Sequence, residues 1–183
     1  VSAVHVYSVS PNLNYSEADR LSVSKTSTGS MIAFSKLEAE IVLPDDAILT
    51  EATVHFERRS AAETTGAAVA VSQVTSSWNA ETVTYATKPA YSSTILDYCL
   101  TSTASTEYSW DITALMKQWI DTPSSNYGLA FWITDDSPSP SQIAFYITNN
   151  ANDAQKPYYQ IKYRDTKGIE EYYDYFTSTA DGA

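Results

Sequence analysis

The chain has 183 residues, a length typical of a single domain, and its 22 Asp and Glu outnumber its 11 Lys and Arg to give a formal net charge of −11. Because nucleic acids and membrane surfaces are negatively charged, this excess predicts no binding to nucleic acids or to a membrane surface. No run approaches 18 apolar residues, so no membrane insertion is expected. The five glycines stand too far apart to form a dinucleotide-binding or phosphate-binding loop, and the single cysteine excludes an intrachain disulfide and a cysteine-based zinc cluster.

Apolar and polar residues alternate along most of the chain, which is the period-two pattern of half-buried β-strands. In chain order, strands are expected at residues 4–9, 21–24, 31–36, 52–57, 69–74, 94–98, 108–112, 129–133, 143–147 and 158–163. Many short strands separated by polar turns are typical of a β-sandwich or jelly roll. The sequence therefore predicts an all-β fold, a jelly-roll β-sandwich.

One segment departs from this alternation. Between residues 112 and 119, four apolar residues follow the i, i+3, i+4, i+7 spacing of an amphipathic helix. Either Asp111 or Thr113 is expected to cap the N-terminus of this helix, and Pro123 to end it. The sandwich is thus expected to carry one short helix, with Trp119 in the core.

Aromatic side chains offer the best candidates for ligand binding, because sugar rings stack their apolar C–H faces on flat aromatic rings. Trp132 and Tyr146 lie on strand faces opposite to the apolar ones, and their strands are expected to form a hairpin across residues 135–142. Tyr158 is also expected to face outward. These three residues are the predicted glycan-binding platform, and the alternative is that they form a second buried layer beneath loops.

The sequence does not favour catalysis. Neighbouring carboxylates in a strand point to opposite faces, so they do not form the facing pair of a glycosidase, and neither histidine has a Cys or His partner at ligand spacing. No cofactor is expected other than a structural calcium ion, because oxygen-rich loops lie at residues 12–19, 135–137 and 149–153. The candidate calcium ligands are Asn149, Asn152 and Asp153. The alternative is that these side chains only cap turns.

Several longer segments follow one another in a distinctive order. They are GSMIAFSKL (29–37), LPDDAILTEATVHF (43–56), VTSSWNAETVTYATKP (74–89), YSWDITALMKQWI (108–120), SNYGLAFWI (125–133) and KPYYQIKYR (156–164). This order resembles that of the DNRLRE-type domain, although Ser35 stands where that family has Asp and Tyr85 where it usually has Trp. The tail GIEEYYDYFTSTADGA resembles the segment that leads into the RHS/YD repeats of bacterial wall-associated proteins.

The resemblance implies a β jelly roll from a secreted or cell-surface bacterial protein, with some relatives classed as carbohydrate-binding modules. It divides the chain into a DNRLRE-like module at residues 1–164 and a linker to downstream domains at residues 165–183. Two functions remain open: a non-catalytic carbohydrate-binding module, or a structural or adhesive spacer that binds no sugar. The net charge favours a neutral glycan over alginate or pectin, unless calcium or the patch at Arg58 and Arg59 intervenes. The oligomeric state is not predicted.

Overall fold

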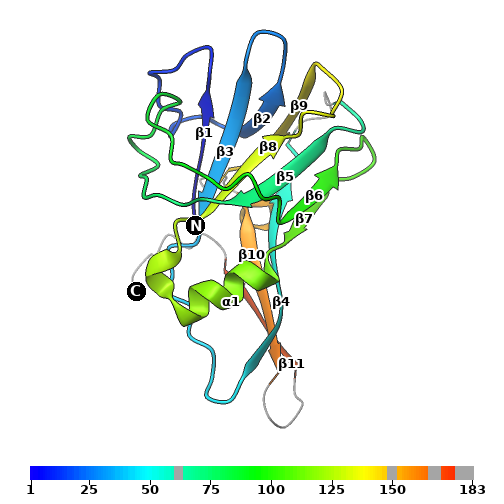
Figure 1. Ribbon diagram of the computed structural model, residues 1–183. Coiled ribbons are helices and arrows are strands. Elements are labelled where there is room, and N and C mark those ends of the chain that lie inside the picture. Colours follow the sequence, from blue (N-terminus) through cyan, green and yellow to red (C-terminus); the bar gives the residue numbers. More distant parts are fainter. Residues whose placement is uncertain (60–63, 148–151, 165–169, 176–183) are drawn as a thin grey trace.

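The computed structural model describes residues 1–59, 64–147, 152–164 and 170–175. Within these residues, two antiparallel sheets form a sandwich (Figure 1). The larger sheet contains β1 (Ser2–Tyr7), β2 (Leu21–Lys25), β3 (Ser30–Lys36), β5 (Ala68–Gln73), β6 (Asp97–Leu100), β8 (Leu129–Ile133) and β9 (Ser141–Phe145). The smaller sheet contains β4 (Ile48–Glu57), β7 (Glu107–Asp111), β10 (Tyr158–Arg164) and β11 (Glu170–Tyr175). This architecture confirms the predicted all-β jelly-roll β-sandwich.

The order of strands in each sheet decides which surfaces are open. The larger sheet runs β6-β5-β8-β3-β2-β9, with β1 paired to β3, and the smaller sheet runs β11-β10-β4-β7. The hairpin that was expected between the strands at 129–133 and 143–147 is wrong, because β3 and β2 lie between β8 and β9. Alternation defines the two faces of each strand, but it carries no information about which strand lies next to it.

The main core lies between the two sheets and is dominated by aromatic rings. The ring centroid of Phe131 on β8 lies 4.7 Å from that of Phe56 on β4 and 5.1 Å from that of Trp110 on β7. The Trp110 indole donates a hydrogen bond to the Val69 carbonyl at 2.9 Å, so its polar atom is satisfied although the side chain is fully buried. The burial of Trp119 confirms its predicted place in the core.

The predicted helix is α1 (Thr113–Asp121), which lies beside β4 and buries Leu115, Met116 and Trp119 (Figure 1). The prediction that Asp111 or Thr113 caps the helix is wrong, because the N-cap is Ile112 and no side chain makes a capping hydrogen bond. The two predicted residues instead make hydrogen bonds that fix the chain just before the helix. The Asp111 carboxylate accepts a hydrogen bond from the Thr113 N–H at 2.7 Å, and the Thr113 hydroxyl accepts one from the Ala52 N–H at 2.9 Å. The helix ends before Pro123, which begins the short 3₁₀ helix η1 (Pro123–Ser125). A second 3₁₀ helix, η2 (Asp153–Gln155), precedes β10.

Ser35, which stands where the DNRLRE-type pattern has Asp, lies inside the sandwich. Ser35 is completely buried on β3, and its hydroxyl lies 3.2 Å from the Tyr159 hydroxyl on β10. Burial raises the pKa of Tyr159, so this pair is a neutral hydrogen bond between the two sheets. A hydroxyl at this position thus satisfies a tyrosine that the core would otherwise leave unpaired.

A second apolar cluster lies on the outer face of the larger sheet. Its buried members are Val4, Val6, Ile32, Phe34, Val74, Val83 and Ala130. Half-buried aromatic residues pack against it, including Trp78, whose indole donates to the Tyr127 carbonyl at 2.7 Å. Residues 74–91 supply several of these side chains, so this segment covers one part of the outer face and leaves the part near β6 open.

The smaller sheet continues beyond residue 164. Strand β11 pairs with β10 from Tyr159↔Tyr175 to Arg164↔Glu170. This strand was not among those expected from the sequence, because its acidic and aromatic residues do not alternate cleanly. The predicted boundary between a module at residues 1–164 and a linker at residues 165–183 stays a prediction.

Candidate functional site

The structure does not bring the three predicted platform residues together. Trp132 lies on the outer face of the larger sheet, half-buried against the second apolar cluster. Tyr158 lies on the outer face of the smaller sheet and stacks on His55 with ring centroids 4.4 Å apart. Tyr146 follows β9, and its N–H donates to the Glu57 carbonyl at 3.0 Å. Trp132 and Tyr158 therefore lie on opposite sides of the sandwich, and none of the three is among the residues that line the groove described next.

A groove of about 420 Å³ lies on the outer face of the larger sheet, where β6 and β5 meet the loop after β8. We call it the β6 groove, and it is lined by Gly66, Ala68, Ile95, Tyr98, Leu100, Thr134, Asp136 and Ser137. Strand register explains why these residues meet. Ala68 pairs with Leu100 and Ala70 pairs with Tyr98, while the intervening residue Val69 points into the core. Because Ala68 on β5 is small, the surface is lower there than at the larger Tyr98 and Leu100 side chains of β6.

One wall of the β6 groove is apolar and open to solvent. Ile95, Tyr98 and Leu100 expose 40%, 58% and 60% of their surfaces. An exposed aromatic ring between two aliphatic side chains is a surface that apolar faces of a ligand can cover. The wall therefore favours a ligand with a flat C–H face.

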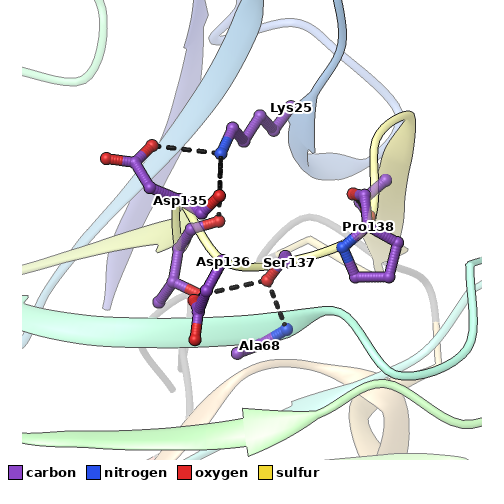
Figure 2. Close-up of polar contacts among 8 residues, drawn as sticks. Lys25, Ala68, Asp135, Asp136, Ser137 and Pro138 are labelled. Atoms are coloured by element: carbon purple, nitrogen blue, oxygen red, sulfur yellow. Dashed lines mark hydrogen bonds and ion pairs between the residues drawn. The ribbon is translucent and has the colours of Figure 1, made fainter.

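The opposite rim is polar and held by hydrogen bonds within the loop at residues 134–138 (Figure 2). The Thr134 hydroxyl lies 2.5 Å from the Asp136 carboxylate and 3.0 Å from the Ser137 hydroxyl, which accepts a hydrogen bond from the Ala68 N–H at 2.9 Å. The hydrogen bond from Thr134 lowers the pKa of Asp136. The rim thus presents an ionised carboxylate, which accepts hydrogen bonds from a ligand.

A lysine from a distant strand anchors the same loop. In Figure 2 the Lys25 ammonium on β2 points into the turn, and it donates to the Asp135 carboxylate at 3.0 Å and to the Asp135 and Thr134 carbonyls at 2.8 and 3.3 Å. The loop at residues 135–137 was one of the oxygen-rich candidates for calcium. Lys25 therefore holds this loop through two oxygen atoms of Asp135 and the carbonyl of Thr134.

The proposed calcium ligands fall at the edge of the described residues. The Asn152 side-chain oxygen accepts a hydrogen bond from the Ala154 N–H at 3.2 Å, which is a turn-capping contact. Asn149 and the Asp153 side chain lie outside the described part of the chain. Across the residues that the structure does describe, no three His, Cys, Asp or Glu side chains gather as a metal site would require. The calcium site stays a prediction.

The arginine patch at positions 58 and 59 is engaged within the module. The Arg58 guanidinium donates to the Ser102 and Thr103 carbonyls at 2.8 and 3.0 Å. The Arg59 guanidinium forms an ion pair with Asp19 at 2.8 Å. The residues that line the β6 groove include no Lys or Arg, and the nearby Lys25 ammonium is already paired with Asp135.

Sequence reasoning missed most residues of the groove. Tyr98 was placed on an expected strand, and its alternation with the half-buried Cys99 was visible in the sequence. What the sequence did not show is that β6 is an edge strand whose outer face is left open. Asp136 was considered only as part of the oxygen-rich loop at residues 135–137, because its place in one groove with Tyr98 depends on how the loop after β8 lies against β5 and β6.

The structure is a β-sandwich whose shallow groove combines an exposed tyrosine with a fixed polar rim. This arrangement is expected of a module that binds carbohydrate. The model of carbohydrate-binding module family 96 matches residues 3–163, and the chain belongs to this family. Modules of this kind bind carbohydrate without catalysing its cleavage, which agrees with the expectation that the chain is not an enzyme. A comparison with curated proteins found no match. Among the described residues, no helix is both long and apolar enough to span a membrane.

Proposed function

We propose that this carbohydrate-binding module binds a neutral glycan in the β6 groove. The observation that carries the proposal is the pairing of an exposed Tyr98 with a hydrogen-bonded polar rim across one shallow hollow. A sugar ring lies with its C–H face on the Tyr98 ring, and its hydroxyls donate to the Asp136 carboxylate and exchange hydrogen bonds with Ser137. The lack of Lys and Arg in the lining supports a neutral ligand rather than a uronic acid polymer.

The rim is organised before the ligand arrives. Hydrogen bonds from Ala68, Thr134 and Lys25 already hold the loop at residues 134–138 in place. Binding a sugar therefore does not require this loop to lose further conformational freedom, and a rigid site loses less free energy to ordering than a flexible one. The preorganised rim therefore favours binding at this groove.

The sequence resemblance supports a wider setting for the module. We infer a DNRLRE-type domain of a secreted or cell-surface bacterial protein, joined through residues 165–183 to downstream domains that include RHS/YD repeats. This inference rests on the order of the motifs between residues 29 and 164 and on the tail that follows them.

The alternative function is a structural or adhesive spacer with no sugar ligand. It is favoured by the covering of other aromatic residues, since Trp78, Tyr85, Tyr91 and Tyr127 pack against the second apolar cluster instead of standing free. Tyr98 is the aromatic residue that this alternative leaves unexplained, because 58% of its surface is exposed.

Affinity electrophoresis separates the two functions. Soluble β-glucan, arabinoxylan and galactomannan are cast in native gels, with polygalacturonate as the anionic comparison. We expect at least one neutral polymer to retard the wild type, Tyr98→Ala to lose this retardation, and Leu13→Ala to keep it, because Leu13 is equally exposed but lies outside the groove. Retardation by none of the neutral polymers would favour the spacer. Unchanged retardation of Tyr98→Ala would show that the β6 groove is not the site.

A further inference from the structure

Two aromatic residues flank a small residue on the open face of the larger sheet. Ala70 on β5 pairs with Tyr98 on β6 at one side and with Trp132 on β8 at the other. All three side chains share the outer face, because Val69 and Val71 beside Ala70 belong to the main core. Tyr98, Ala70 and Trp132 therefore form one row that runs across the strands, which we call the aromatic row.

The Trp132 side chain reaches over β5. Its indole N–H donates to the Ser72 hydroxyl at 3.3 Å, and Ser72 lies on β5 next to Ala70 on the same face. Ala70 and Ser72 are small and have no exposed surface, so they support the two rings from below. The Cα atoms of Tyr98 and Trp132 are separated by two strand spacings, about 10 Å.

A second row lies parallel to the aromatic row, two residues further along each strand. It contains Leu100 on β6 and Ala68 on β5, which pair with each other, and Thr134 after β8, whose N–H donates to the Ala68 carbonyl at 3.0 Å. Asp136 and Ser137, in the loop that follows Thr134, line the groove together with this row. Hydrogen-bonding groups thus line one side of the aromatic row.

We propose that the ligand is an extended neutral polysaccharide with equatorial linkages, crossing β6, β5 and β8 with successive rings over Tyr98 and Trp132. This inference rests on the proposed function. Equatorial linkages keep successive rings nearly coplanar and leave C–H bonds on their faces, so one chain covers two rings that lie on a flat sheet. Axial linkages turn each ring away from the last and allow contact with one aromatic residue at a time. Hydroxyls along one edge of the chain meet Asp136 and Ser137.

Calorimetry with short oligosaccharides tests this geometry. The probes are glucose and the β-1,4-linked gluco- and xylo-oligosaccharides up to tetramers, compared with α-1,4-linked gluco-oligosaccharides of the same lengths. We expect affinity in a β-1,4 series to rise at least tenfold from monomer to trimer and to exceed that of the α-1,4 series at least tenfold. Tyr98→Ala is expected to weaken binding at every length, and Trp132→Ala to remove most of the gain with length.

Trp132 also packs against the second apolar cluster, so Trp132→Phe serves as a second variant that keeps an apolar ring in place. We expect Trp132→Phe to lose part of the gain with length, because the smaller ring covers less of the second sugar. Equal affinity for the two linkages, no gain with length, or no binding of either β-1,4 series would overturn the crossing geometry. These calorimetric results can fail while the electrophoresis succeeds. If a neutral polymer retards the wild type in gels but does not retard Tyr98→Ala, the proposed function stands and only this inference fails.

Discussion

At the scale of single residues, the groove depends on side chains whose surroundings differ from those of their neighbours. Asp135 and Asp136 are adjacent in the sequence, but the Asp135 carboxylate is paired with Lys25, whereas the Asp136 carboxylate lines the β6 groove. Two carboxylates next to each other thus have different roles, one in holding the loop and one in facing a ligand.

Asp136→Ala is expected to weaken glycan binding about fivefold, because a net hydrogen bond contributes about 1 kcal/mol. Calorimetry with the polymer that the wild type binds is the measurement. Asp45→Ala is the matched control, since Asp45 is exposed and lies outside the groove. Equal affinity of Asp136→Ala and wild type would remove Asp136 from the site.

A buried histidine makes stability depend on pH. His5 is 4% exposed and stacks on Tyr15, and burial lowers its pKa from 6.5 to about 4. Between these values the unfolded chain binds a proton at His5 and the folded chain does not, so stability falls as the pH falls through this window. The stability contribution lost on going from pH 7 to pH 4.5 is about 2 to 3 kcal/mol.

Urea unfolding of wild type and His5→Phe at pH 7 and pH 4.5 measures this dependence. The variant keeps an aromatic ring next to Tyr15 but has no proton to gain, so its loss of stability between the two pH values is expected to be smaller by that amount. Asp19, whose pKa the Arg59 and Arg20 hydrogen bonds lower to about 2, loses its stabilising effect only below pH 3.8 and does not enter this comparison. The same pH dependence in both proteins would contradict the role of His5.

At the scale of elements, the start of β8 shows why a glycine is needed in the segment SNYGLAFWI. Gly128 has φ of 92°, and a Cβ atom at this position would overlap the Ser35 carbonyl oxygen on β3. The Asn126 side chain accepts a hydrogen bond from the Gly128 N–H at 3.1 Å and donates one to the Leu37 carbonyl at 2.9 Å. The turn therefore sets how closely β8 approaches β3.

Gly128→Ala is expected to destabilise the fold more than Gly66→Ala. Both glycines have positive φ, which costs a non-glycine residue about 1–2 kcal/mol, but a Cβ atom at Gly66 meets no atom within 4 Å. The overlap at Gly128 adds about 1–3 kcal/mol. Urea unfolding of the two variants gives the difference directly. Equal destabilisation would mean that β8 moves away from β3 without loss.

At the scale of the whole molecule, the candidate binding groove and the added strand β11 lie on different sheets. The β6 groove lies on the larger sheet, whereas β11 extends the edge of the smaller sheet, beyond the matched residues 3–163. The chain has a net charge of −11, and the lining of the groove includes one carboxylate and no basic side chain. Recognition of a neutral ligand is therefore expected to depend little on salt.

A chain of residues 1–164 is expected to fold and to bind glycan with the same affinity as the full chain, because β10 still pairs with β4 and the groove lies on the other sheet. Its stability is expected to be lower, since removal of β11 exposes the edge of β10. Circular dichroism with thermal unfolding, followed by affinity electrophoresis, tests both expectations. An unfolded product would show that the domain extends beyond residue 164.

The sequence by itself determined the class of fold, the helix whose apolar stripe runs from residue 112 to residue 119, and the buried face of the clearly alternating strands, because these follow from local periodicity. It also identified Trp132 as an outer-face aromatic residue. Only the tertiary structure decided that β8 lies beside β5 instead of β9, that β6 is an edge strand, and that residues 74–91 cover part of the outer face and leave Tyr98 open. These features depend on contacts between segments far apart in the chain, and alternation along one strand does not encode the identity of its neighbours.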